Sequence, residues 1–266
     1  MQITGSVALV TGANRGIGRA IAEQLLERGA AKVYAAARRP ESVDLPGVEP
    51  LRLDITDPEQ VAAAAAAAPD LTLLVNNAGI SLPTNLVSGE LADIRREVDT
   101  HLWGTLAMVR ALAPVLAANG GGAIANLASA LSWFAVPGAT GYHVGKAAQW
   151  AMSNGIRLEL AEQGTSVTSV HLGAADTDMM AGYEGPLLAP AEVATAVLDG
   201  VEAGAPEVLV DEWSRQIKAA LPGDATAFAM AALAGLRGEG SEPDQPMRPA
   251  MSGPPVSTGS PSSPMR

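Results

Sequence analysis

The chain has 266 residues, a net charge of −11 and no cysteine. Because nucleic-acid binding relies on a basic surface that displaces counterions from phosphates, this charge argues against a nucleic-acid partner. The absence of cysteine excludes disulfides and thiolate catalysis, and three scattered histidines argue against a metal site. We expect a cytoplasmic protein without a membrane partner, since no apolar run approaches about 20 residues and the first residues do not resemble a signal peptide.

Short apolar runs alternate with longer helical patterns along the chain. The expected strands are 7–11, 32–37, 51–53, 71–76, 123–128, 166–172 and 207–210. These runs are continuous rather than alternating, which is typical of a parallel sheet covered on both faces. The main helices are expected at 16–28, between Asp57 and Pro69, at 90–118 and at 142–161. Seven strands with interleaved helices predict a Rossmann-type α/β fold, a single doubly wound parallel sheet.

The chain divides by composition into two parts. Residues 1–236 carry the strand and helix patterns and are predicted to form one domain. Residues 237–266 are dominated by Pro, Ser and Gly and contain few groups that a core could bury. We predict that this second segment is a disordered tail.

The first strand is followed by TGANRGIG, residues 11–18. Its glycines permit a tight turn, and the following helix N-terminus offers free N–H groups to a pyrophosphate. No GK[ST] sequence ends the motif, so an ATP- or GTP-hydrolysing loop is excluded. The residues expected to contact a dinucleotide here are Gly12, Asn14, Arg15, Gly16, Ile17 and Gly18.

The end of the second expected strand, AAARRP, bears on the choice of cofactor. An acidic residue at this place normally binds the ribose 2′-hydroxyl of NAD, whereas arginine binds the 2′-phosphate of NADP. Residues 32–40 contain no acid, but they include Arg38 and Arg39, and Arg15 lies in the glycine-rich loop. A solvated basic turn is the alternative, but three arginines in so acidic a chain favour NADP(H).

The sequence GYHVGK places Tyr142 and Lys146 four residues apart at the start of a helix, hence on one face. A nearby ammonium group would favour the phenolate and lower the tyrosine pKa, which suits proton transfer. Ser129 lies thirteen residues before Tyr142, just after the strand 123–128. From there its hydroxyl could bind a substrate carbonyl.

Taken together, these motifs resemble the short-chain dehydrogenase/reductase family from about Ser6 to Val210. The matching elements, in family order and spacing, are TGANRGIG, Asp54, NNAG at 76–79, Ser129, Tyr142 with Lys146, and HLGAADT at 171–177. The resemblance implies that Tyr142 exchanges a proton with the substrate oxygen and that Ser129 orients the carbonyl. It also implies that Lys146 binds the nicotinamide ribose.

Further cofactor contacts follow from the same resemblance. Asp54 and Ile55 would contact the adenine, and Gly173 and Thr177 the nicotinamide end. The cofactor ribose would be contacted by Asn77, Ala78 and Gly79. The helices 90–118 and 142–161 pair across a two-fold axis in the family, which predicts a homodimer or homotetramer.

His101 departs from the family pattern. The family usually has asparagine at this catalytic position, and that asparagine supports a water next to the lysine. Two interpretations are open: a hydrogen-bonded core histidine, or a polar relay beside Tyr142. The register with Ser129 and Tyr142 favours the relay. The usual proline before Gly173 is Leu172 in this chain.

The segment after Thr177 falls where the family carries its substrate lid. We expect the apolar side chains of this lid to line the site: Met179, Met180, Tyr183, Leu187 and Leu188. Trp133 and Phe134 could add aromatic surface, or could instead pack in the core. An apolar or aromatic ketone or alcohol would then be the small-molecule substrate.

Three functions are open from the sequence. The favoured one is an NADP(H)-dependent carbonyl reductase that also runs as an alcohol dehydrogenase. The second keeps the fold and cofactor but performs redox-neutral chemistry, with His101 as an added acid–base group. The third is a non-catalytic NADP-binding protein, against which the intact Ser129, Tyr142 and Lys146 argue.

Overall fold

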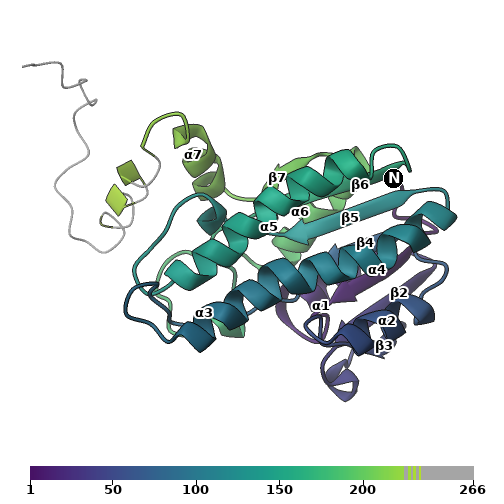
Figure 1. Cartoon of the computed structure of the whole chain (residues 1–266). Coiled ribbons are helices and arrows are strands. Elements are labelled where there is room, and N and C mark those ends of the chain that lie inside the picture. Colours follow the sequence, from purple (N-terminus) through teal and green to yellow (C-terminus); the bar gives the residue numbers. More distant parts are fainter. Residues whose placement is uncertain (225–226, 229, 232–233, 235–266) are drawn as a thin grey trace, which may run out of the picture.

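The chain folds around one parallel sheet of seven strands (Figure 1). The computed structural model describes residues 1–224, 227–228, 230–231 and 234, so the predicted tail at 237–266 lies outside the described residues. The strand order is β3-β2-β1-β4-β5-β6-β7. The strands are β1 (Val7–Thr11), β2 (Lys32–Ala37), β3 (Glu49–Arg52), β4 (Leu73–Asn76), β5 (Gly122–Leu127), β6 (Thr165–His171) and β7 (Glu207–Leu209). The predicted doubly wound α/β fold is therefore confirmed.

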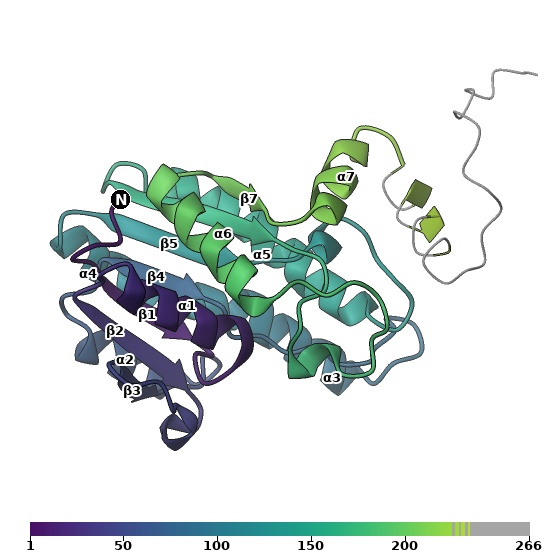
Figure 2. The same ribbon diagram turned by 180° about the vertical axis from the view of Figure 1, so that it is seen from behind.

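Helices cover both faces of the sheet (Figures 1 and 2). One face carries α2 (Pro58–Ala67), α4 (Thr105–Ala118) and α5 (Thr140–Glu159), and the other carries α1 (Gly16–Glu27) and α6 (Pro190–Ala203). Each face buries its own apolar cluster, with Leu74, Leu112 and Ile124 in one and Val10 and Val197 in the other. Because both faces are buried, the strands are continuous apolar runs.

The predicted helix at 90–118 consists of α3 (Leu91–Val98), a π-helical turn (Asp99–Gly104) and α4. Gly104 lets this turn approach the loop after β3, since a Cβ there would lie 2.8 Å from Cγ1 of Ile55. By length and composition alone the segment Leu91–Ala118 could cross a membrane, which inspection of apolar runs did not reveal. In the fold it packs against the sheet, where Leu112 and Leu116 are fully buried. It therefore serves as a core helix.

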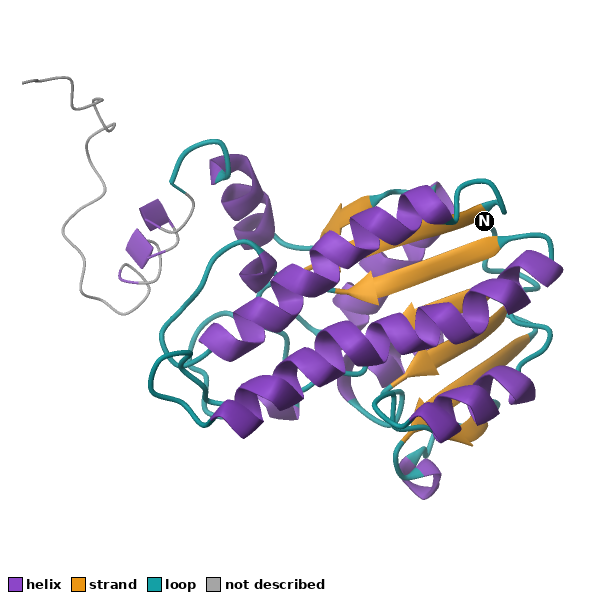
Figure 3. Cartoon of the chain, viewed as in Figure 1, coloured by secondary structure: helices purple, strands orange, loops and turns teal. Residues whose placement is uncertain are grey.

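All strand arrows point to the same edge of the sheet, where the connecting loops gather (Figure 3). The loops after β1, β4, β5 and β6 carry the glycine-rich motif, the NNAG residues, Ser129 and Gly173, respectively. The short helix α7 (Glu212–Ala220) packs at this end, beside the 3₁₀ turn Ala130–Ser132. Parallel topology thus brings motifs that are far apart in sequence to one edge.

Candidate active site

A cleft of about 1460 Å³ runs along the carboxyl edge of the sheet. Every predicted site residue except Gly18 lines it, namely Gly12, Asn14, Arg15, Gly16, Ile17, Arg38, Asp54, Ile55, Asn77, Ala78, Gly79, His101, Ser129, Tyr142, Lys146, Gly173 and Thr177. The fold therefore brings the predicted cofactor-contacting and catalytic residues together in one continuous cavity.

The glycine-rich loop is shaped by two positive backbone φ angles, +67° at Gly12 and +54° at Gly16. Gly18 lies beneath the loop, where a Cβ would stand 2.3 Å from the carbonyl oxygen of Gly12, so its contribution is close packing. Helix α1 begins at Gly16, and no side chain caps its first turn. These free N–H groups and the positive end of the helix dipole suit a pyrophosphate.

Asn77 holds this loop in place from the neighbouring strand. Its side-chain amide donates to the carbonyl oxygens of Thr11, at 2.9 Å, and Gly12, at 3.2 Å. The hydroxyl of Thr11 in turn accepts from the backbone N–H groups of Asn77 and Ala78. The amide of Asn77 is thus engaged with the loop.

Arginines stand at the cleft end formed by β2. Arg38 and Arg39 are exposed there, and neither makes an ion pair with any residue that the structure describes. Arg15, the third predicted cation, instead pairs with Asp178 of the segment after Gly173. Two guanidinium groups are therefore free to bind a phosphate in the cleft.

Three of the four predicted catalytic side chains come from the turn after β5 and from α5. Ser129 follows β5 and caps the turn Ala130–Ser132, where its Oγ accepts from the N–H of Leu131 at 3.1 Å. Tyr142 and Lys146 lie one turn apart on α5. The Lys146 amine donates to the Leu127 carbonyl and, at 3.0 Å, to Oε1 of Gln149.

Burial is the main cause of the pKa shifts of Tyr142 and Lys146. It raises the pKa of Tyr142 above its usual value, an effect that the hydroxyl of Ser129 opposes by hydrogen bonding. Burial also lowers the pKa of Lys146 to about 7, against the opposing effect of the Glu97 carboxylate. The sequence predicted that Lys146 would lower the tyrosine pKa, but the structure gives Tyr142 the opposite shift because the phenol is buried.

A buried polar network fixes Lys146 from below, and sequence reasoning missed it. Nδ2 of Asn76 donates to Oδ1 of Asn126, and Nδ2 of Asn126 donates to Oγ of Ser153, both at 2.9 Å. Gln149 accepts from Lys146 and donates to Oγ1 of Thr105 at 3.1 Å. The only sequence signal was an asparagine within each of two otherwise apolar strands.

His101 is fully buried beside Tyr142, with the two ring centroids 5.1 Å apart. Its Nε2 lies 2.8 Å from the carbonyl oxygen of Ile80 and 3.2 Å from Oε2 of Glu97. Glu97 is also fully buried, and sequence reasoning missed it although its i,i+4 spacing to His101 was visible. A carboxylate therefore joins the predicted catalytic group.

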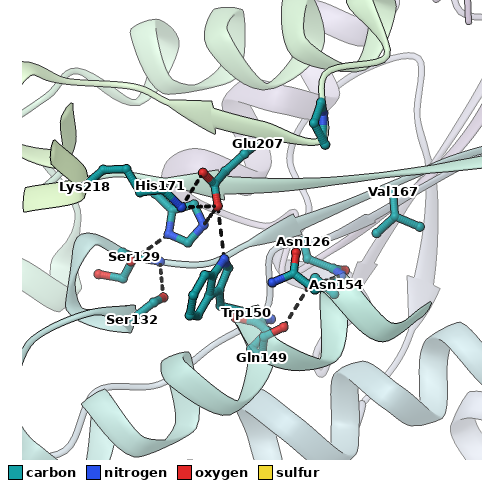
Figure 4. Close-up of polar contacts among 12 residues, drawn as sticks. Asn126, Ser129, Ser132, Gln149, Trp150, Asn154, Val167, His171, Glu207 and Lys218 are labelled. Atoms are coloured by element: carbon teal, nitrogen blue, oxygen red, sulfur yellow. Dashed lines mark hydrogen bonds and ion pairs between the residues drawn. The ribbon is translucent and has the colours of Figure 1, made fainter. Parts of the chain in front are cut away.

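A second buried histidine, His171, supports Ser129 from the other side (Figure 4). Its Nδ1 lies 3.0 Å from the carbonyl oxygen of Ser129, and its Nε2 lies 3.6 Å from Oε1 of Glu207. Glu207 pairs with Lys218 of α7 at 2.7 Å and accepts from Nε1 of Trp150 at 3.0 Å. This cluster connects α7 to the backbone at Ser129.

The apolar lining differs in part from the prediction. Phe134, Met179, Met180 and Tyr183 line the cleft, whereas Leu187 and Leu188 are not part of its wall. Trp133 is also absent from the wall, because its ring stacks on His171 with centroids 4.0 Å apart. Trp213 of α7, which the sequence did not single out, lines the cleft and makes an edge contact with Phe134.

Comparison with known proteins agrees with this architecture. Residues 6–185 match the family model described as short chain dehydrogenase. The chain belongs to the short-chain dehydrogenases. A Staphylococcus aureus protein named as an uncharacterized oxidoreductase is 32% identical over 210 residues, which cover 74% of this chain and 90% of that protein. The chain is therefore an oxidoreductase of this family.

Solved structures show the same likeness. A short-chain dehydrogenase from Burkholderia cenocepacia, crystallised in complex with NADP, is 42% identical with a TM-score of 0.82, covering 88% of this chain and 98% of that one. A short-chain dehydrogenase from Streptomyces avermitilis is 28% identical with a TM-score of 0.71, covering 90% of this chain and 96% of that one.

Proposed function

We propose that this protein is an NADP(H)-dependent carbonyl reductase, reversible as an alcohol dehydrogenase, for small to medium apolar substrates. The observation that carries the proposal is the convergence of Ser129, Tyr142 and Lys146 on a cleft that also contains the glycine-rich loop and an apolar wall. Proton donor, carbonyl-binding group and cofactor site thus share one cavity, which is the arrangement that carbonyl reduction needs.

The residues divide the chemistry among them. NADPH bound in the cleft supplies the hydride. Ser129 orients the substrate carbonyl with its hydroxyl, and Tyr142 donates a proton to the carbonyl oxygen. Because burial raises the pKa of Tyr142, the phenol stays protonated near neutral pH and is ready to act as this donor. Lys146 binds the nicotinamide ribose, and His101 lies beside Tyr142 as a fourth polar group.

The choice of NADP(H) rests on charge at the end of β2. Arg38 and Arg39 are exposed at the cleft, and the segment 32–40 offers no carboxylate to a ribose 2′-hydroxyl. The short-chain dehydrogenase from Burkholderia cenocepacia, which is 42% identical to this chain, was crystallised in complex with NADP. A guanidinium–phosphate contact of this kind contributes about 1.5–3 kcal/mol.

Replacing Arg38 tests the cofactor assignment. Arg38→Asp should weaken NADPH binding by about tenfold or more, because it removes a charge-assisted contact and adds a repulsive charge. NADH binding should change little or improve. Fluorescence titration of both cofactors measures this, and equal NADPH and NADH affinities in the wild type would refute the assignment.

The substrate class follows from the cleft wall. Phe134, Met180 and Trp213 face the same cavity as Ser129 and Tyr142. An apolar or aromatic group attached to the carbonyl would bury surface against them, at about 25 cal/mol per Å². NADPH oxidation measured against a panel of hydrophobic ketones and polar sugars should favour the ketones.

The same panel separates the alternative functions. Product formation without NADPH consumption would indicate redox-neutral chemistry on this fold. Cofactor binding with no turnover of any compound would indicate a non-catalytic NADP-binding protein.

We also propose a cytoplasmic homodimer or homotetramer that forms through α4 and α5. Trp103, in the π-helical turn that leads into α4, is 56% exposed, and Leu158 on α5 is 79% exposed. Large apolar side chains on adjoining helices are typical of an interface between copies. Light scattering after gel filtration should give a mass of at least two chains, and Trp103→Glu should lower it.

A further inference from the structure

The peptide group between Leu172 and Gly173 is held from both sides at the wall of the cleft. Its carbonyl oxygen, on Leu172, accepts from the backbone N–H of Ala130 at 2.9 Å and lies 3.5 Å from Oγ of Ser129. Its N–H, on Gly173, donates to Oδ2 of Asp211 at 3.0 Å. The orientation of this one peptide plane is therefore linked to Ser129 on one side and to Asp211 on the other.

The sheet brings Asp211 to this position. Strands β6 and β7 pair in parallel, with His171 opposite Leu209. Gly173 and Asp211 each follow two positions later, so the two residues leave the sheet side by side. The close approach depends on glycine, because a Cβ at Gly173 would lie 2.6 Å from Oδ2 of Asp211. A residue with a side chain at this position would push the carboxylate away from the amide.

The second carboxylate oxygen of Asp211 holds the helix that follows. Oδ1 accepts from the backbone N–H of Ser214 at 3.0 Å and caps the start of α7. Trp213 lies in this first turn, where it lines the cleft and makes an edge contact with Phe134. A Cβ at Gly173 would lie 3.3 Å from Cδ1 of Trp213, so the indole packs beside the same peptide group. Asp211 does not line the cleft, so it acts on the site only through the groups that it holds.

We propose that Asp211 is a positioning residue of this active site: its carboxylate fixes the Leu172–Gly173 peptide group beside Ser129 and joins that group to α7. Leucine leaves its φ angle free where a proline would fix it, so the orientation of the peptide depends on these hydrogen bonds. Ala130 directly follows Ser129, and a rotated peptide would release the backbone next to the catalytic hydroxyl. The catalytic consequence rests on the proposed function, whereas the two hydrogen bonds of Asp211 belong to the folded protein alone.

A purely structural role for Asp211 would be to cap α7. Asp211→Ser separates the two roles, because serine is also a preferred helix cap. Its single, shorter oxygen can accept from the N–H of Ser214 but leaves the N–H of Gly173 without its acceptor. Ser214→Ala is the matched control: it keeps the backbone N–H and removes a buried hydroxyl that has no hydrogen-bond partner among the described residues.

The hydrogen bond at Gly173 can be measured by NMR on the full chain. Leu172 and Gly173 form the only Leu-Gly pair in the sequence, so leucine labelled with ¹³C at the carbonyl and glycine labelled with ¹⁵N give one HNCO signal. We expect slow hydrogen exchange of this amide in the wild type and in Ser214→Ala. Exchange should be at least about tenfold faster in Asp211→Ser, because a charge-assisted hydrogen bond is lost.

Equal exchange rates in the wild type and Asp211→Ser would overturn the proposal. If Asp211→Ser fails to fold, the wild type decides alone, since exchange at the rate of an unprotected glycine would show that the Asp211 carboxylate does not hold the amide.

Turnover provides the second readout. Asp211→Ser should lower kcat for ketone reduction by about tenfold to 100-fold, because a small misplacement of a catalytic group has an effect of this size. The KM of the ketone should rise by less than about threefold, because the cap of α7 and with it Trp213 are retained. Ser214→Ala should match the wild type in both constants. An unchanged kcat alongside faster exchange at Gly173 would overturn the catalytic part. A wild type that reduces no ketone would refute the proposed function and leave the NMR result to stand by itself.

Discussion

The two histidines that flank the catalytic serine and tyrosine have the same kinds of neighbours in opposite arrangements. Each ring is fully buried, with one nitrogen about 3 Å from a backbone carbonyl oxygen and a carboxylate nearby. In His101 the carboxylate of Glu97 and the carbonyl share Nε2. In His171 the carbonyl of Ser129 is at Nδ1, and Glu207 lies 3.6 Å from the opposite nitrogen.

The carboxylates differ even more than the rings. Glu207 already has a cation in Lys218 and a donor in Trp150. Among the described residues, Glu97 has no Lys or Arg within ion-pair distance, and His101 is its one basic partner. A carboxylate that is already neutralised makes a structural anchor, whereas one whose basic partner is the active-site ring can stabilise charge that appears during the reaction. We therefore propose that His171 supports the backbone at Ser129 and that His101 takes part in proton transfer.

Burial lowers the pKa of both His101 and His171, and the positive charge of Lys146 lowers both pKa values further. Lys146→Met should reduce turnover by more than about 100-fold, because ribose binding and the charge beside Tyr142 are both lost. Its effect on stability has two opposing parts: the hydrogen bonds from Lys146 to Leu127 and Gln149 are lost, and so is the buried ammonium, whose pKa burial lowers from 10.5 to about 7. Urea unfolding of both proteins across the pH range checks this.

The lowered pKa of Lys146 also makes the stability of the wild type depend on pH. Between the folded pKa of about 7 and the unfolded value of 10.5, the unfolded chain binds more protons than the folded one, so wild-type stability rises with pH. The stability of Lys146→Met relative to the wild type should therefore be highest near neutral pH and fall as pH rises toward the unfolded value of 10.5. A difference in stability that stays constant over this pH range would contradict the burial argument.

Paired phenylalanine substitutions probe the contrast directly. His101→Phe should lower kcat by about tenfold to 100-fold per folded molecule, with little change in NADPH affinity. His171→Phe keeps the stacking on Trp133 but removes one hydrogen bond to the Ser129 carbonyl, which still accepts from the Ser132 N–H, so it should cost about 0.5–1.5 kcal/mol of stability. His101→Asn, the family's usual residue, should retain activity. If His101→Phe is active and His101→Asn unstable, His101 is a core residue.

Lys218→Met removes the cation that neutralises Glu207. Lys218 lowers the pKa of His171 and Glu207 raises it, so this substitution should move the pKa of His171 upward from about 4. The shift should be about one unit, because a neighbouring charge is removed while burial remains. NMR titration of the imidazole measures it, with the pKa of His101 as the internal reference. A downward shift would contradict the described cluster.

The smallest effect is expected from the tail. Deleting residues 240–266 should leave Tm and NADPH affinity unchanged, because this segment has little apolar surface to bury. Thermal unfolding of the shortened chain checks this. A drop of several degrees would show that the segment docks onto the domain.

The sequence predicted the strands, the helix cap and the glycine-rich loop correctly, because neighbouring residues determine these features. The runs at 7–11 and 32–37 became strands with those same bounds, and Asp57 caps α2 by accepting from the N–H groups of Glu59 and Gln60. The glycine-rich loop was equally readable, because its backbone angles demand glycine. These features need no knowledge of the distant chain.

What the sequence did not reveal depends on distant contacts. The sequence left open whether Trp133 lines the site or packs in the core, and its stacking on His171, thirty-eight positions later in the chain, decides for packing. Glu97 was not singled out from the sequence, because its burial depends on the loop at Leu82 and on the packing of α5 against α3. Tyr142 was expected to have a lowered pKa from its spacing to Lys146, yet the depth of burial decides the direction.

Tyr142→Phe tests the central claim most directly, because it removes a single oxygen from the proposed proton donor. NADPH oxidation with a hydrophobic ketone should fall by about 100-fold or more, and the alcohol formed should equal the NADPH consumed in the wild type. NADPH affinity should remain within about twofold, since the phosphate loop and Arg38 are unchanged. Wild-type rates of ketone reduction by folded Tyr142→Phe would contradict the assignment of this cleft as a carbonyl reductase.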